Sequence, residues 1–216
     1  MSEPTDPHSG AQILSAGAPL EKAKAAVILV HGRGASAQDI LSLAPHIGTP
    51  DVAFLAPQAH GSTWYPYSFM AAAGANEPWL SSALGLLGWL VADVGSAGVP
   101  PERIALVGFS QGGCLALTFA ARTAQRYGAL AGLSAGLIGP PGTAFAFNGS
   151  LASTPVFMGC SDIDPHIPLE RVEESAGVLA GMGGTVDKRI YPGMGHMVNE
   201  EELTAVAALV AGMAGN

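Results

Sequence analysis

The chain has 216 residues and a formal net charge of -8, because 17 Asp and Glu outnumber 9 Lys and Arg. The basic residues are scattered and form no stripe that could hold a phosphate backbone, which argues against nucleic acid as a partner. Hydrophobic residues make up 49% and charged residues 12%, a balance typical of strands that are covered on both faces by helices. The composition therefore favours a single α/β domain and excludes a disordered or fibrous chain.

The first ten residues are polar and rich in Pro, and they predict a flexible leader over 1–10 before a domain over 11–216. They lack the basic and apolar segments of a signal peptide, so we expect a cytoplasmic protein. Apolar stretches are interrupted before the about 20 residues that a membrane span needs. Cys114 and Cys160 are the only cysteines. We expect both to be reduced, and no metal or cofactor is implied.

Short apolar runs alternate with segments of helical spacing along the chain, and Gly or Pro bounds most of the runs. This alternation predicts an open, mostly parallel sheet flanked by helices, with the functional site at the carboxyl ends of the strands. In chain order, strands are predicted at 25–30, 52–56, 103–107, 130–134, 155–159 and 186–191, and helices at 37–45, 78–94, 111–126, 168–180 and 200–213.

The segment Gly-Phe-Ser-Gln-Gly-Gly at 108–113 follows a predicted strand and begins a predicted helix. A serine in so sharp a turn projects its hydroxyl above the sheet and leaves no room for side chains two residues to either side, which accounts for Gly108 and Gly112. In a chain with 29 glycines this short pattern also arises by chance. The prediction that Ser110 is a nucleophile therefore depends on the strand before the motif and the helix after it, and not on the motif alone.

A serine nucleophile needs a general base that is itself oriented by a carboxylate. When the serine lies in a turn of this kind, the acid and then the histidine follow along the chain. Asp164 comes after the strand at 155–159, and His196 comes after the strand that ends at Tyr191. Both lie on loops at the carboxyl ends of strands, so they are the predicted acid and base.

The loop that contains Asp164 also offers an alternative acid and an alternative base. Asp162 is an alternative acid, whose other role is to cap its own turn. His166 is an alternative base, although it lies two residues from Asp164 and cannot easily face the serine while that acid orients it. Three further histidines are expected at the surface or in loops: His8, His46 and His60.

The oxyanion that forms during acyl transfer needs preorganised N–H donors. The residue after the nucleophile, Gln111, provides one backbone N–H. The loop after the first predicted strand, 31–34, is predicted to provide the other from Arg33. The Arg33 side chain is expected to brace this loop, with Asp39 or Glu77 as a partner. The alternative is that this Gly-rich loop is only a tight turn between strand and helix.

Together, several motifs resemble the small bacterial phospholipase/carboxylesterase family, which is related to the acyl-protein thioesterases. The resemblance runs from about residue 25 to the end and rests on the segments HGRG, APQ, WY, NEPW, GFSQGG, GCSDIDPHIP and YPGMGH. It implies an α/β-hydrolase fold without a large lid domain. It also implies the same nucleophile, acid, base and oxyanion donors: Ser110, Asp164, His196, Arg33 and Gln111.

Thioesterase members usually carry an apolar residue at the position of Arg33 and a Gly-Asp pair at the positions of Ala35 and Ser36. The form HGRGAS resembles the carboxylesterase branch instead, which implies a small-molecule, short-chain ester as the substrate. The alternatives are a thioesterase or lysophospholipase acting on longer acyl chains, and a catalytically silent binding or scaffold member of the fold. A homodimer is left open.

The aromatic-rich stretch 61–79 is predicted to line a shallow substrate pocket, and its alternative role is ordinary packing beneath a long loop. The predicted pocket residues are Trp64, Tyr65, Met70 and Trp79. Because no insertion is long enough to build a cap, we expect acyl chains of about two to six carbons to be preferred.

Overall fold

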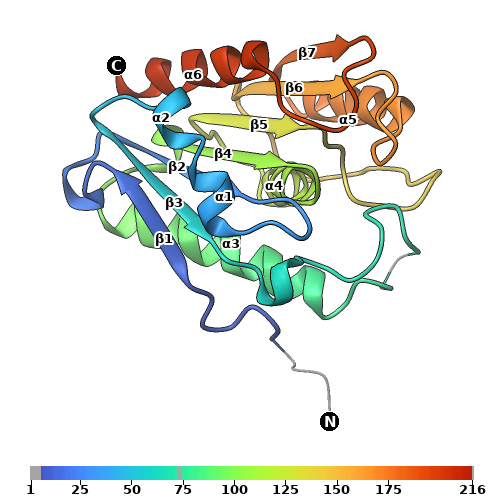
Figure 1. The fold of residues 1–216 in the computed structure, drawn as a ribbon, viewed down its shortest axis with the longest axis horizontal. Helices are drawn as coiled ribbons and strands as arrows, with labels where there is room; N and C mark the ends of the chain where they lie inside the picture. Colours follow the sequence, from blue (N-terminus) through green and yellow to red (C-terminus); the bar gives the residue numbers. More distant parts are fainter. Residues whose placement is uncertain (1–5, 73, 216) are drawn as a thin grey trace.

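A computed structural model describes residues 6–72 and 74–215. Seven strands form one sheet in the order β1-β3-β2-β4-β5-β6-β7, and every neighbouring pair is parallel except β1 with β3. Figure 1 shows the strands running side by side through the middle of the molecule. Their bounds are Ile13–Gly17 (β1), Ala25–Val30 (β2), Val52–Pro57 (β3), Ile104–Phe109 (β4), Ala129–Leu133 (β5), Pro155–Ser161 (β6) and Thr185–Tyr191 (β7).

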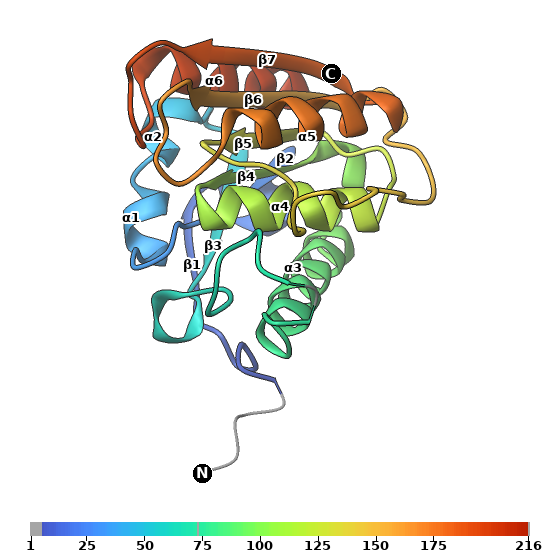
Figure 2. The ribbon, with the colours of Figure 1, turned by 90° about the vertical axis from the view of Figure 1, so that its right-hand side faces the viewer.

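Helices cover both faces of this sheet, because the central strands are apolar on both faces. In β2, Val27 belongs to a core cluster that includes side chains of α1, α2 and α6, whereas Ile28 belongs to a cluster that includes side chains of α3, α4 and α5. Figure 2 shows these two groups of helices on opposite sides of the strands. The helices are α1 (Ala37–Leu41), α2 (Ala44–Ile47), α3 (Trp79–Ser96), α4 (Gln111–Arg122), α5 (Leu169–Gly181) and α6 (Glu200–Ala214). Short 3-10 turns occupy Leu20–Lys22, His60–Ser62 and Pro101–Arg103.

The predicted α/β fold is confirmed, and the differences are local. Strand β1 was missed because Ile13–Gly17 is a half-exposed edge strand with no continuous apolar run. The helix predicted over 37–45 is two helices, since Pro45 lies in the first turn of α2 and begins a new helix there. The helix after Ser110 ends at Arg122, four residues before its predicted end.

Residues 6–10, the described part of the predicted leader, pack against the domain, and residues 1–5 lie outside the described residues. The His8 ring is 2% exposed. It donates from Nε2 to the carbonyl of Trp64 at 3.0 Å and accepts at Nδ1 from the backbone N–H of His60 at 3.2 Å. His8 was expected at the surface or in a loop. It does lie in a turn, but it is buried rather than at the surface. Its partners lie more than fifty residues away, so no local pattern shows them.

Among the described helices, α3 is long and apolar enough to cross a membrane, with a mean hydropathy of 1.2 over 18 residues. This helix differs from the expectation that every apolar stretch is interrupted before a membrane-spanning length. One such helix is weak evidence for a span, since a helix packed on a protein core has the same composition. In this fold α3 packs against α4 and buries six side chains: Leu80, Ala83, Leu87, Leu90, Val91 and Val94.

Candidate active site

Ser110 lies at the sharp turn between β4 and α4, with φ 55° and ψ -123°. A positive φ is strained for a residue with a side chain, and such strain is concentrated at functional sites. A Cβ on Gly108 would lie 2.5 Å from the carbonyl of Gly112, and one on Gly112 would lie 2.2 Å from the carbonyl oxygen of Val30. Only glycine fits at these two positions, which explains the spacing of the motif.

The Ser110 hydroxyl lies 2.8 Å from Nε2 of His196, and Nδ1 of His196 lies 2.7 Å from a carboxylate oxygen of Asp164. Because an ionised carboxylate only accepts hydrogen bonds, the His196 proton lies on Nδ1, and Nε2 is free to accept from the serine. His196 follows β7 and Asp164 follows β6, so three loops at the carboxyl edge of the sheet bring these side chains together.

The Asp164 carboxylate is fully buried. Burial raises its pKa, but hydrogen bonds from His196 and from the backbone N–H groups of His166 and Ile167 outweigh this effect, and the net pKa is lowered. Those two N–H groups lie 2.8 and 3.0 Å from the oxygen that does not face His196. Asp164 is therefore held ionised in the orientation that fixes the histidine tautomer.

The two alternative residues on this loop take other positions. Asp162 accepts a hydrogen bond from the backbone N–H of Gly193 at 2.7 Å, which joins its loop to the loop of His196. The ring of His166 meets the His196 ring edge-on, with centroids 4.8 Å apart. No hydrogen bond joins the His166 ring to Ser110 among the described residues. His46 and His60 are exposed, as expected.

The backbone N–H groups of Arg33 and Gln111 have no protein acceptor in the described part of the chain. Gln111 begins α4 directly after Ser110. The loop of Arg33 lies against the serine, since a Cβ on Gly32 would be 3.4 Å from the Cβ of Ser110. The two unpaired N–H groups therefore lie at the turn where an oxyanion would form.

The Arg33 side chain braces a different segment from the one predicted. Nη1 donates to the carbonyl of Pro66 at 2.8 Å, and Nη2 donates to the carbonyls of Tyr65 and Tyr67 at 2.9 and 2.6 Å. The expected partners are engaged elsewhere by local hydrogen bonds, Asp39 with Ser36 and Glu77 with Ser81.

The side chain of Gln111 has a role that was not predicted from the sequence. Its Oε1 accepts from the backbone N–H of Trp64 at 2.9 Å, and its Nε2 donates to the carbonyl of Tyr65 at 2.8 Å. The residue that offers a backbone N–H beside the serine thus also holds the segment that passes over it. A glutamine after the serine was the only local signal for this contact.

A cavity of about 430 Å³ opens over Ser110 and His196. Of the four predicted pocket residues, Tyr65 lines it, while Trp64, Met70 and Trp79 do not. Their predicted placement is corrected: the fully buried Trp64 indole donates to the carbonyl of His31 at 2.8 Å, and Met70 and Trp79 are partly buried against the hydrophobic core. The cavity is lined by Arg33, Tyr65, Pro66, Tyr67, Ser68, Phe69, Ser110, Gln111, Cys114, His166, Ile167 and His196.

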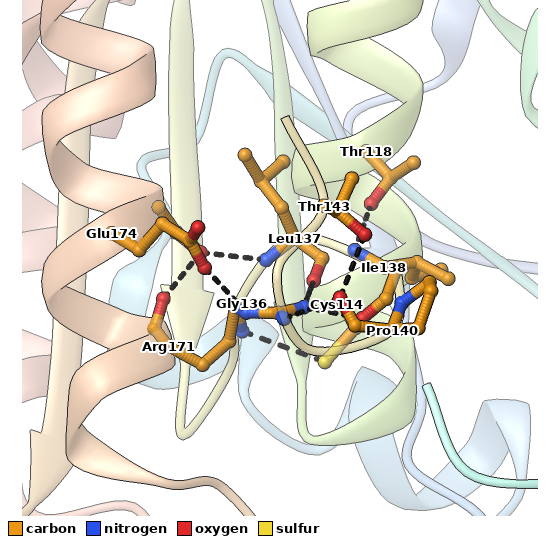
Figure 3. Close-up of polar contacts among 11 residues, drawn as sticks. Cys114, Thr118, Gly136, Leu137, Ile138, Pro140, Thr143, Arg171 and Glu174 are labelled. Carbon is orange, nitrogen blue, oxygen red and sulfur yellow. Dashed lines mark hydrogen bonds and ion pairs between the residues drawn. The ribbon is translucent and has the colours of Figure 1, made fainter. Parts of the chain in front are cut away.

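Arg171 of α5, which is 3% exposed, supports one wall of this cavity from behind. Figure 3 shows its side chain inside the loop after β5, where Nη1 donates to the carbonyls of Leu137 and Gly139 at 2.8 and 2.7 Å. Its Nε pairs with Glu174 at 2.9 Å. The N–H of Gly139 in turn donates to the carbonyl of Phe69 at 2.9 Å. The buried arginine thus holds Phe69 in the cavity wall, through carbonyl acceptors that no sequence motif marks.

Comparisons with known proteins agree with the fold described above and give its family. The sequence profile of a family described as Phospholipase/Carboxylesterase matches residues 11–212. The chain is similar to a crystal structure of a phospholipase/carboxylesterase from Dyadobacter fermentans, with a TM-score of 0.89, 41% identity, and coverage of 93% of this chain and 96% of that one. It is also similar in fold to the esterase PE8, with a TM-score of 0.77 and 23% identity over 94% of this chain and 99% of that chain.

Among curated proteins, the chain is 40% identical over 116 residues to acyl-protein thioesterase 1 of Gibberella zeae, over 53% of this chain and 49% of the relative. It is 27% identical over 113 residues to a probable carboxylesterase of Oryza sativa, over 52% of this chain and 42% of the relative. The matched segment therefore spans about half of each relative's length.

Proposed function

The chain belongs to the phospholipase/carboxylesterase family, and on this premise we propose that it is a serine carboxylesterase that hydrolyses short-chain carboxylic esters through an acyl-enzyme. The observation that carries the proposal is the continuous chain of hydrogen bonds from Ser110 through His196 to Asp164. Nucleophile, base and orienting acid have the geometry that acyl transfer requires.

In the proposed reaction, Nε2 of His196 takes the Ser110 proton while Oγ bonds to the ester carbonyl carbon. The electron pair of the carbonyl moves to its oxygen, and the backbone N–H groups of Arg33 and Gln111 stabilise that charge. When the intermediate collapses, the bond to the alcohol oxygen breaks and His196 returns the proton to the leaving alcohol. In the second half of the reaction His196 takes a proton from water, and the water oxygen bonds to the acyl carbon. The bond from that carbon to Ser110 Oγ then breaks, Oγ takes the proton back from His196, and the carboxylic acid is released.

Two observations favour short acyl chains. Phe69 lines the cavity of about 430 Å³, and the loop that Arg171 holds supports it through the hydrogen bond from the N–H of Gly139 to the Phe69 carbonyl. Among the described residues, the segments between β3 and α3 and between β5 and β6 also contain no α-helix that could form a large lid. Each buried methylene gains about 0.8 kcal/mol only while apolar wall remains to receive it. Hydrolysis is therefore proposed to be fastest at about two to six acyl carbons.

A thioesterase is the second candidate, favoured by the 40% identity to acyl-protein thioesterase 1 of Gibberella zeae. The same triad would attack a thioester carbonyl, so the two candidates differ in acyl length and leaving group. A series of p-nitrophenyl esters from acetate to palmitate, run beside the matched acyl thioesters, distinguishes them. Highest kcat/KM on long-chain substrates would replace the short-chain carboxylesterase with a thioesterase or lysophospholipase.

The proposal is tested with p-nitrophenyl acetate hydrolysis and labelling by a fluorophosphonate. Ser110→Ala should fold normally, lose label and fall below about a hundredth of the wild-type rate. The matched control, Ser96→Ala at the exposed end of α3, should keep both. A wild-type chain that neither turns over nor labels is a silent scaffold, and the proposed activity is then wrong.

A further inference from the structure

Arg33 brings a positive charge to the cavity that no carboxylate neutralises. Its three hydrogen bonds all go to neutral carbonyls, and no Asp or Glu of the described residues lies within ion-pair distance of it. A guanidinium has five N–H groups, so two remain free for another acceptor. The side chain is exposed and borders the cavity.

The rest of the cavity also lacks negative charge. No Asp or Glu of the described residues lines it, and His166 is one of the residues that do. Asp164 is fully buried behind His196 and is engaged there. In a chain with a net charge of -8, the mouth of the catalytic cavity is thus a place where a cation faces solvent without a counter-charge.

Arg171 shows the contrast within the same fold. It is also bound to three loop carbonyls, but it is 3% exposed and paired with Glu174. That guanidinium has a structural role and its charge is compensated. Arg33 holds a loop in the same way, but its charge is not paired with a carboxylate and can interact with a substrate in the cavity.

We propose that the Arg33 side chain selects esters that carry a carboxylate group over neutral esters of the same shape. This inference rests on the proposed esterase function and names a substrate class for it. A carboxylate accepts charge-assisted hydrogen bonds from a guanidinium, and these are stronger than bonds between neutral groups. Because the site is open to water, the expected preference is modest, about fivefold in kcat/KM.

Two pairs of substrates show whether Arg33 recognises a carboxylate on the leaving group or one on the acyl chain. The first pair is 4-acetoxybenzoate and its methyl ester, followed by acetate release, which differ in charge on the leaving group. The second pair is mono-p-nitrophenyl glutarate and p-nitrophenyl pentanoate, which differ in charge at the end of the acyl chain. For each pair, kcat/KM for the charged ester is divided by kcat/KM for the neutral ester, in wild type and in each variant. The difference in intrinsic reactivity between the two esters then cancels when the ratio in a variant is compared with the ratio in wild type.

Arg33→Met should lower this ratio about fivefold for at least one pair, and Arg33→Lys should retain part of it because the charge remains. Arg126→Met is the matched control: the exposed Arg126 also donates to loop carbonyls, those of Ala152 and Ser153, but it does not line the cavity. Its ratio should equal the wild-type ratio. The preference should also shrink as salt rises from about 0.05 to 0.5 M.

Ratios that are equal in wild type and Arg33→Met for both pairs would overturn the inference. That failure is distinct from failure of the proposed function, because a wild-type chain that hydrolyses neutral esters with an unchanged ratio is still an esterase. A chain that hydrolyses none of the four esters overturns both.

Discussion

The carboxylate of Asp162 and the backbone N–H of Gly193 are joined by a hydrogen bond of 2.7 Å, which ties the loop after β6 to the loop that carries His196. Two residues further on, Asp164 contacts the His196 ring itself. The two acidic residues of this loop therefore have separate roles, one toward the backbone of the histidine loop and one toward its side chain.

This division predicts different results for two matched variants. Asp164→Asn should lower kcat by about 10³- to 10⁴-fold, because an amide no longer fixes the imidazole tautomer or stabilises the imidazolium. Asp162→Asn retains an oxygen that accepts from Gly193 and should cost less than about threefold. Steady-state kinetics on p-nitrophenyl acetate separates the two, and the reverse ranking would move the acid to Asp162.

The glycines of the serine turn predict a large effect on stability. Gly112→Ala places a Cβ about 2.2 Å from the carbonyl oxygen of Val30 and should lower the free energy of unfolding by at least about 3 kcal/mol, since backbone must move. Gly85→Ala, on the exposed face of α3, meets nothing within 4 Å and should raise stability by about 0.5–1 kcal/mol. Urea unfolding measures both, and a Gly112→Ala protein as stable as wild type would contradict the close approach.

Glu202 predicts a pH dependence of stability. It is fully buried, completes a capping box with Asn199, and has one carboxylate oxygen without a partner in the described residues. Burial raises its pKa from 4.5 to about 7. Because the folded-state pKa is the higher one, the stability from this group is fully present below about pH 4.5 and is lost as pH rises through about 7.

The variant Glu202→Gln stays neutral at every pH and still completes the capping box. The stability of wild type relative to this variant should therefore fall by about 1–2 kcal/mol between about pH 5 and 8. Urea midpoints at several pH values measure this, with Glu200→Gln, at the exposed start of α6, as the control. Parallel curves for wild type and Glu202→Gln would show that Glu202 does not titrate in this range.

The lining of the cavity predicts which aromatic residue determines the acyl-chain length that the enzyme prefers. Phe69→Ala should open the wall and raise the kcat/KM ratio of p-nitrophenyl hexanoate to butanoate, by about fourfold for each methylene that gains contact. Trp64→Ala should instead lower stability by about 3–5 kcal/mol, because Trp64 is fully buried outside the cavity. Kinetics and urea unfolding on both variants check the assignment. A shift of acyl preference in Trp64→Ala without loss of stability would return Trp64 to the pocket.

The sequence by itself determined the fold class and the candidate triad. Buried parallel strands are continuous apolar runs, so Ala25–Val30 was predicted with the bounds that the structure has. Ser110, Asp164 and His196 were also predicted, because parallel strands bring the loops at their carboxyl ends to one edge of the sheet. Each of these signals lies within a few neighbouring residues and needs no knowledge of distant contacts.

Tertiary structure decided everything that depends on contacts between distant segments. The carbonyls that Arg33 and Arg171 bind, the burial of His8, and the inward orientation of Trp64 all join residues more than thirty positions apart. A backbone carbonyl is the same chemical group at every residue, so no pattern in the sequence marks which one a side chain will find. Only the packed chain fixes which carbonyls face an arginine and which aromatic rings face the cavity.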